Sequence, residues 1–329
     1  MNKFAIFINF NDAYIPYLNV LLNSIDYHKI YVDVFLMYYG ECIDYVKSAI
    51  DIFNFNIIPV EIKKEDFFIN EFNKNNNNLF IKQSRFKYIR EFGHQYDAIA
   101  MLDADMFIVS EEFTSLFNLV SGTNKLIGCN EKFKWIFSDK YIHENKPILD
   151  RSFKAYKFHC SVPIIFDLNK WLDVFDFYNK IAYNCFEKID EYTIKPIGDI
   201  YCWNISVYKN YREKDVILFP MQTMTQVHHT YALPWAGISK QNDSKWITND
   251  GEHVYSIHGR IGKKSWEDGQ LRGVKKCFEQ YGINFSDRLE TNVKNTFRSI
   301  QKEWYKFNFN YKLNLYDFFP KNDYWESFK

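Results

Sequence analysis

Residues 96–109, YDAIAMLDADMFIV, constrain the fold of this chain more than any other stretch. The apolar run 98–102 is typical of a central strand covered on both faces, and it leads directly into two carboxylates, Asp103 and Asp105. A carboxylate buried there costs several kcal/mol unless a hydrogen bond or a metal ion compensates it. Because side chains at positions i and i+2 of an extended segment point the same way, the pair could bind one cation at the carboxyl end of the strand.

The composition indicates a globular protein without a dedicated nucleic-acid surface. With 329 residues, 47% of them hydrophobic, the chain can bury a large core. Its 41 basic and 41 acidic side chains balance, so no overall field favours a polyanion. The cysteines lack metal-binding spacing, the first residues make a poor signal peptide, and no apolar stretch reaches the ~18 residues that span a bilayer. We therefore expect a cytoplasmic protein, free or at the cytoplasmic face of the membrane.

The first half of the chain alternates between short apolar runs and stretches of helical spacing. Such alternation predicts an α/β fold with helices on both faces of a mostly parallel sheet, in which ligands bind beyond the carboxyl ends of the strands. Neither a GxGxxG fingerprint nor a P-loop motif follows the first run, which disfavours NAD and P-loop nucleotides. The expected strands are 4–10, 30–38, 57–62, 98–102 and 106–109, and the expected helices are 14–25, 42–53 and 79–92.

The second half of the chain is less regular. Two long stretches, 133–157 and 228–249, are interpreted as loops, and loops of this length usually shape a site. Between and around them, the expected strands are 125–129, 161–168, 216–218 and 254–257, and the expected helices are 112–120, 169–186 and 197–207.

We expect one domain over residues 1–270 and a C-terminal helical and aromatic extension over residues 271–329. Helices are expected at 267–281 and 288–304. The stretch 307–315 then alternates strictly between apolar and polar residues, which predicts a half-buried edge strand. Alternatively, its exposed aromatic side chains would need cover, and the extension would dock on a membrane surface or a partner.

Three side chains form a candidate metal site. Asp103 and Asp105 supply carboxylate oxygens, and His258, which directly follows an expected strand, supplies a neutral nitrogen. This mixed donor set suits Mn²⁺ or Mg²⁺ and leaves positions open for a diphosphate, whose remaining charge Arg85, Lys263 or Lys264 would neutralise. The structural alternatives are carboxylates satisfied by backbone amides and an ordinary packed histidine.

Two motifs resemble the nucleotide-sugar core of glycosyltransferase family 8, the family of glycogenin and the lipopolysaccharide galactosyltransferases. The first joins Ser84-Arg85-Phe86, across a helix and a turn, to YDAIAMLDAD at residues 96–105. The second is HGRIGKKSW at residues 258–266, which is similar to the family's His-x-x-Gly-x-x-Lys-Pro-Trp. Its histidine, lysine and tryptophan are in register, whereas its glycine is displaced by one residue and serine replaces the proline.

The resemblance implies a GT-A fold and a metal-dependent glycosyltransferase. Such an enzyme moves a sugar from a nucleotide-diphosphate sugar, here expected to be a UDP-sugar, to a hydroxyl of a glycan or another acceptor, with retention of configuration. The resemblance also implies that Asp103, Asp105 and His258 hold Mn²⁺ or Mg²⁺, and that Ala104, between the two aspartates, lines the same donor site.

The resemblance further assigns residues to the donor itself. Arg85 and Lys264 are expected to touch the diphosphate or the sugar and to stabilise the charge of the leaving group, which makes them catalytic candidates. Phe10, Asn11 and Asp12 are expected to lie against the nucleobase and the ribose.

The acceptor half departs from the family pattern. Cys160-Ser161-Val162 stands where the family has Asn-Ala-Gly, and the family's Asp-Gln-Asp-x-x-Asn keeps only Asp199 and Asn204. We expect Asp199 to orient the acceptor or the sugar, or to act as general base if the enzyme inverts. A helix N-cap is its structural alternative.

Other classes of protein fit part of the pattern. The altered acceptor motifs also fit a sugar-nucleotide-binding protein with weak or no transferase activity, or an inverting GT-A transferase whose acceptor is an unusual protein or nucleic acid. A nucleotidyltransferase would use similar metal chemistry, but the chain lacks its Gly- and Arg-rich phosphate loop after the first expected strand.

Overall fold

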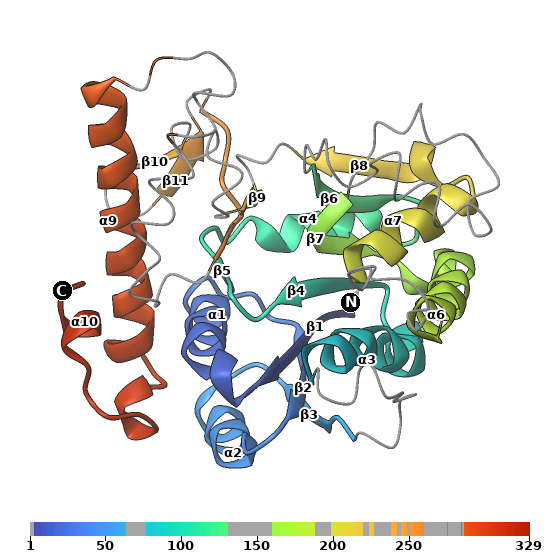
Figure 1. Ribbon diagram of the computed structural model, residues 1–329, viewed down its shortest axis with the longest axis horizontal. Coiled ribbons are helices and arrows are strands. Elements are labelled where there is room, and N and C mark those ends of the chain that lie inside the picture. The colour runs from blue at the N-terminus through green and yellow to red at the C-terminus, as the bar shows by residue number, and fades with distance from the viewer. Residues whose placement is uncertain are drawn as a thin grey trace.

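The computed structural model describes residues 3–63, 77–130, 160–187, 199–219, 224–226, 238–241, 245–248, 251–259, 275, 284 and 286–329. A seven-stranded sheet lies at its centre, and helices flank the sheet (Figure 1). The strand order is β3 (Ile57–Glu61), β2 (Asp33–Tyr39), β1 (Phe4–Asn11), β4 (Ala98–Asp103), β7 (Cys160–Phe166), β6 (Leu126–Asn130) and β8 (Val216–Phe219). All pairs are parallel except those of β7 with β4 and β6, so the predicted mostly parallel α/β sheet is confirmed.

The helices closely follow the alternation expected from the sequence. The first helix shows why, because Leu18, Leu21, Leu22 and Ile25 recur at helical spacing and all four are fully buried. The helices are α1 (Ile15–Tyr27), α2 (Ile43–Ile52), α3 (Asn77–Phe92), α4 (Phe113–Val120), α6 (Leu172–Glu187), α7 (Asp199–Lys209), α9 (Asp287–Phe309) and the short α10 (Asp323–Glu326).

A second, three-stranded sheet joins distant parts of the chain. It contains β5 (Met106–Ile108), β12 (Ser256–His258) and β9 (Met224–Gln226), with β12 in the middle. Because β12 pairs antiparallel with β5, its last residue lies opposite the first residue of β5, directly after the two aspartates. This pairing brings His258 to the end of β4.

The prediction of an uninterrupted loop over residues 228–249 is wrong. A two-stranded antiparallel hairpin, β10 (Ile238–Gln241) with β11 (Lys245–Thr248), lies within that range. Its strands are short and mostly polar, so they lack the apolar periodicity that marks a strand in sequence. The predicted loop 133–157 and, apart from residue 275, the predicted helix 267–281 lie outside the described residues.

The predicted edge strand at 307–315 is also wrong, because α9 continues to Phe309 and a turn follows. Buried Ile300, Trp304 and Phe307 continue the helical spacing of α9 into the alternating stretch. Phe307, Phe309 and Leu313 are buried within the chain, so the docking alternative loses the exposed aromatics on which it was based.

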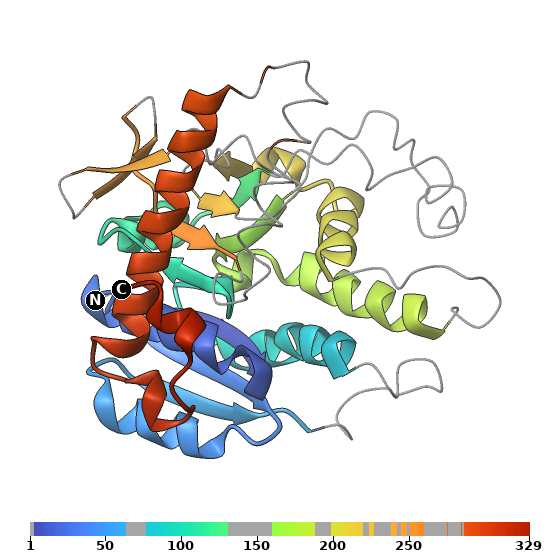
Figure 2. The same cartoon turned by 60° about the vertical axis from the view of Figure 1, so that its left-hand side comes forward.

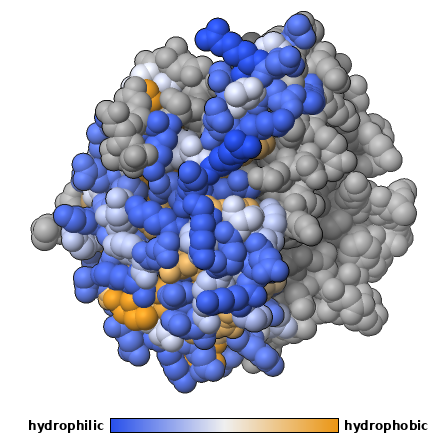
Figure 3. Space-filling model, turned by 90° about the vertical axis from the view of Figure 1, so that its left-hand side faces the viewer, coloured by the Kyte–Doolittle hydropathy of each residue, from blue (hydrophilic) through white to orange (hydrophobic). Residues whose placement is uncertain are grey.

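The face that carries α9 is largely hydrophilic (Figure 3). Among the described residues, no helix combines the length and the apolar character needed to cross a bilayer.

The C-terminal helix α9 packs against α1 (Figure 2), and two fully buried asparagines of α1 hold the C-terminal segment there. The amide nitrogen of Asn19 donates to the side-chain oxygen of Asn308 at 3.0 Å and to the carbonyl of Leu313 at 2.9 Å. The amide nitrogen of Asn23 donates to the carbonyls of Phe307 at 2.6 Å and Leu313 at 3.0 Å. The bond to Phe307 satisfies a carbonyl in the last turn of α9, where a helix leaves its carbonyls without partners, and the bonds to Leu313 hold the segment that follows the helix.

Candidate metal and donor site

The two aspartates lie where β4 ends and the chain turns into β5. Asp103 is the last residue of β4, and Asp105 is the second residue of the turn before β5. The backbone amide of Gly259 donates to the carbonyl of Asp105 at 2.7 Å, which extends the pairing of β5 with β12 past His258. Backbone hydrogen bonds therefore set the position of the histidine relative to both aspartates.

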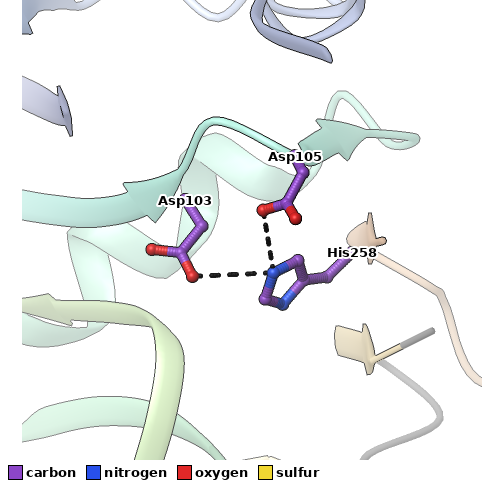
Figure 4. Close-up of side chains that lie close together, drawn as sticks. All are labelled: Asp103, Asp105 and His258. Atoms are coloured by element: carbon purple, nitrogen blue, oxygen red, sulfur yellow. Dashed lines mark hydrogen bonds and ion pairs between the residues drawn. The ribbon is translucent and has the colours of Figure 1, made fainter. Parts of the chain in front are cut away.

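The three predicted metal ligands converge in space (Figure 4). The Nε2 atom of His258 lies 3.1 Å from Oδ1 of Asp105 and 3.6 Å from Oδ2 of Asp103. One ligand atom from each side chain lies within 4.8 Å of the other two. Ligands that share one cation at bond lengths of ~2.2 Å lie up to ~4.4 Å apart, so this set fits a divalent ion with small side-chain rotations.

The exposure of the cluster fits a site that is open on one side. The Asp103 side chain is 33% exposed, whereas those of Asp105 and His258 are 12% and 15% exposed. A cation held here would keep a path to solvent at Asp103, which leaves room for ligands that the protein does not supply.

Arg85 approaches Asp103 from the buried side. This α3 residue is only 3% exposed, and its Nη2 atom donates to Oδ1 of Asp103 at 2.5 Å. Its Nε atom donates to the side-chain oxygen of Asn9 at 2.7 Å, and Nη2 donates to that oxygen too. Asn9 lies on β1 directly opposite Asp103 in the parallel ladder. Sequence reasoning missed Asn9, although a polar residue inside the apolar run of β1 is a signal that could have indicated it.

The residues predicted to face the nucleotide lie at the carboxyl end of β1. Phe10 is 1% exposed, and its ring centroid lies 6.5 Å from that of Tyr38 on β2. Asn11 is the last residue of β1, and its side-chain oxygen is buried without a hydrogen-bond partner among the described residues. Asp12 is exposed and directly follows Asn11.

Burial and then the charge of Asp12 raise the pKa of the Cys42 thiol to about 12, so this thiol stays protonated.

The remaining predicted residues are only partly described. Ala104 is buried in the turn between the two aspartates. Asp199 is the first residue of α7. Lys264 lies outside the described residues. The structure therefore brings together Asp103, Asp105, His258 and Arg85, and leaves the other assignments as predictions.

Comparison with known proteins shows that this chain shares its fold with solved structures whose sequences are only distantly similar to it. No family model and no curated protein sequence matches this chain. The solved structure of the galactosyltransferase LgtC with donor and acceptor sugar analogs matches with a TM-score of 0.52 and 16% identity, over 88% of this chain and 100% of that one. An active-site mutant of LgtC matches with a TM-score of 0.53 and 15% identity over the same shares of the chains.

A larger enzyme has the same fold in one part. The bifunctional glycosyltransferase WbbM matches with a TM-score of 0.50 and 13% identity, over 87% of this chain but only 52% of WbbM. This chain thus spans about half the length of WbbM. At these identities the similarity shows the fold, and this chain has the GT-A-type fold of these glycosyltransferases.

Proposed function

We propose that this chain is a metal-dependent glycosyltransferase that moves a sugar from a nucleotide-diphosphate sugar to a hydroxyl acceptor. One observation carries the proposal: Asp103, Asp105 and His258 meet at coordination distance beyond the carboxyl end of β4 in a GT-A-type fold. Membership of glycosyltransferase family 8, a UDP-linked donor, Mn²⁺ in preference to Mg²⁺, retention of configuration and a cytoplasmic location are parts of the proposal. These parts are supported by the sequence motifs and the chain's composition.

The chemistry follows from the charge that the leaving diphosphate gains as its bond to the sugar breaks. A bound divalent ion would act as a Lewis acid on that diphosphate. Asp103 and Asp105 supply the negative charge that binds such an ion, while the buried guanidinium of Arg85 orients the Asp103 carboxylate. We assign Lys264 to the diphosphate, where an ammonium group would stabilise the same developing charge.

The nucleoside of the donor would lie against the carboxyl end of β1. The oxygen of Asn11 is buried and has no hydrogen-bond partner among the described residues. It supports this placement, because a buried acceptor normally has a donor and a base or ribose N–H or O–H would supply one. We assign Phe10 to the packing behind the nucleobase and Asp12, which is exposed at the same end of β1, to the ribose hydroxyls.

The proposal for the acceptor side concerns Asp199, and a separate proposal concerns the division of the chain into domains. We propose that Asp199, at the start of α7, orients the acceptor or the transferred sugar. We further propose that residues 1–270 form the catalytic domain and that residues 271–329 are an extension held on α1. The altered acceptor motif at 160–162 favours one second candidate, a sugar-nucleotide-binding protein with weak or no transferase activity.

A hydrolysis screen of UDP-, GDP- and CDP-sugars, with Mn²⁺ or with a chelator, tests the proposal. We expect metal-dependent release of one nucleotide, and the anomeric assignment of the sugar product decides between retention and inversion. Asp103→Asn and Asp105→Asn should each lower metal-dependent UDP affinity at least tenfold while the far-UV circular dichroism spectrum stays unchanged. Unchanged calorimetric UDP affinity in both variants, with and without Mn²⁺, would rule out this site. Tight, metal-dependent UDP binding with no turnover of any donor would identify the second candidate.

A further inference from the structure

We propose that Asn9 is a positioning residue of the metal site, which holds Arg85 against one oxygen of Asp103 and so leaves the other oxygen for the cation. The inference rests on the proposed role of Asp103 as a metal ligand. It concerns a residue in the middle of the sheet, on a strand that supplies none of the three ligands.

The two oxygens of the Asp103 carboxylate face different side chains. Its Oδ1 accepts from Nη2 of Arg85 at 2.5 Å, and its Oδ2 lies 3.6 Å from Nε2 of His258, on the side of the metal cluster. A carboxylate can rotate about its terminal torsion at low cost, so this division needs a fixed partner on one side. Arg85 is that partner only if its own guanidinium has a fixed orientation.

Asn9 supplies that orientation. Its side-chain oxygen accepts from both Nε and Nη2 of Arg85, and the two residues are 8% and 3% exposed. Nη2 is therefore shared between Asn9 on β1 and Asp103 on β4, two strands that pair at these very positions. The planar guanidinium turns this sharing into an angular constraint, which an ammonium group would not provide.

The neutral amide explains why an asparagine suits this place. A buried guanidinium needs hydrogen-bond acceptors, because a buried cation without them is strongly disfavoured. An amide oxygen provides one acceptor for two N–H groups without bringing a second negative charge. Asp103 then provides a carboxylate that balances the positive charge of Arg85, which ties the arginine to the proposed metal ligand.

Loss of the Asn9 oxygen should free Arg85 and let the Asp103 carboxylate turn away from the cation. Residues that orient metal ligands from behind typically change metal affinity by ~10- to 100-fold when mutated. Two variants of similar side-chain shape separate the acceptor from the volume. Asn9→Leu fills the same space without an acceptor, and Asn9→Asp keeps an oxygen at the same place.

The experiment measures the affinity for Mn²⁺ alone, by the electron paramagnetic resonance signal of free Mn²⁺, and thermal stability alongside it. The matched control is Asn23→Leu, which removes another buried, hydrogen-bonded asparagine far from the metal cluster in the sequence and on a different element. We expect Asn9→Leu to weaken Mn²⁺ binding about tenfold or more. Asn9→Asp keeps an acceptor for Arg85 and should therefore bind Mn²⁺ more tightly than Asn9→Leu does. Asn23→Leu should lower the melting temperature and leave Mn²⁺ affinity within about twofold.

The outcomes separate this inference from the proposed function. If the wild type binds Mn²⁺ and Asn9→Leu binds it equally well, Asn9 has no positioning role and the metal site stands. If Asn9→Leu and Asn9→Asp weaken binding equally, or if Asn23→Leu weakens it as much as Asn9→Leu does, the acceptor is not the cause and the inference is overturned. If the wild type binds no Mn²⁺ even with UDP present, the proposed metal site fails and the inference fails with it.

Discussion

Replacement of Asn23 by alanine should lower the free energy of unfolding by about 3 kcal/mol, because three hydrogen bonds are lost at a fully buried place. The Asn23 amide nitrogen donates to the carbonyls of Phe307 at 2.6 Å and Leu313 at 3.0 Å, and its oxygen accepts from the amide of Leu313 at 3.3 Å. Each such bond contributes about 1 kcal/mol net, and each buried group left unpaired costs ~1–3 kcal/mol. Urea unfolding, followed by tryptophan fluorescence and circular dichroism, measures the change.

Two further variants sharpen this measurement. Asn292→Ala changes an exposed asparagine of α9 and should stay within about 0.5 kcal/mol of the wild type. Asn19→Ala should also destabilise, and the two losses should not add in Asn19→Ala/Asn23→Ala, because both amides donate to the carbonyl of Leu313. A loss below about 1 kcal/mol in Asn23→Ala would refute the view that these polar contacts hold the C-terminal segment on α1.

Two other predictions concern pH and metal. Burial and then the charge of Lys306 lower the pKa of His28 from 6.5 to about 4. On acidification the unfolded chain therefore takes up this proton before the folded protein does. The free energy of unfolding should fall by at most about 3 kcal/mol as the pH drops from 6.5 towards 4. Urea unfolding near pH 7 and pH 5 should therefore show a smaller acid loss in His28→Gln than in the wild type, and equal losses would contradict the assignment. Mn²⁺ at 100 times its dissociation constant should stabilise the wild type by about 2.7 kcal/mol and the Asp105→Asn variant much less. The shift in melting temperature on adding Mn²⁺ measures this difference. An equal shift in both proteins would count against Asp105 as a ligand.

The cluster of Asp103, Asp105 and His258 was predictable from sequence because its signals are local or repeat a strong motif. Asp103 and Asp105 stand out since charge interrupts an apolar strand, and the cost of burying charge makes such an interruption informative. His258 was predicted from its place after an apolar run and from the motif that it begins. The structure confirms that these three side chains meet.

The polar contacts that hold the fold together were not predictable in the same way. Asn19 and Asn23 lie on α1, but their partners are more than 280 positions away along the chain. A helix with polar residues at i and i+4 commonly exposes them, and no periodicity indicates that a second helix will cover them. The error at 307–315 has the same origin, since tertiary packing around Phe307 and Leu313 overrode the strict alternation from which the edge strand was predicted.

The sequence and the structure indicate different roles for Arg85. In sequence it reads as a basic side chain free to meet a diphosphate, because a cation on a helix before a metal motif suggests a phosphate contact. In the structure its guanidinium is buried, with Asn9 and Asp103 among its partners. A guanidinium bonded to a metal ligand would still stabilise negative charge near the ion, but in this structure it contacts Asp103 directly and so acts on the orientation of that carboxylate. Direct contact with the diphosphate stays a prediction for Arg85, whereas its contact with Asp103 makes the geometry of the proposed metal site depend on β1, α3 and β4 together.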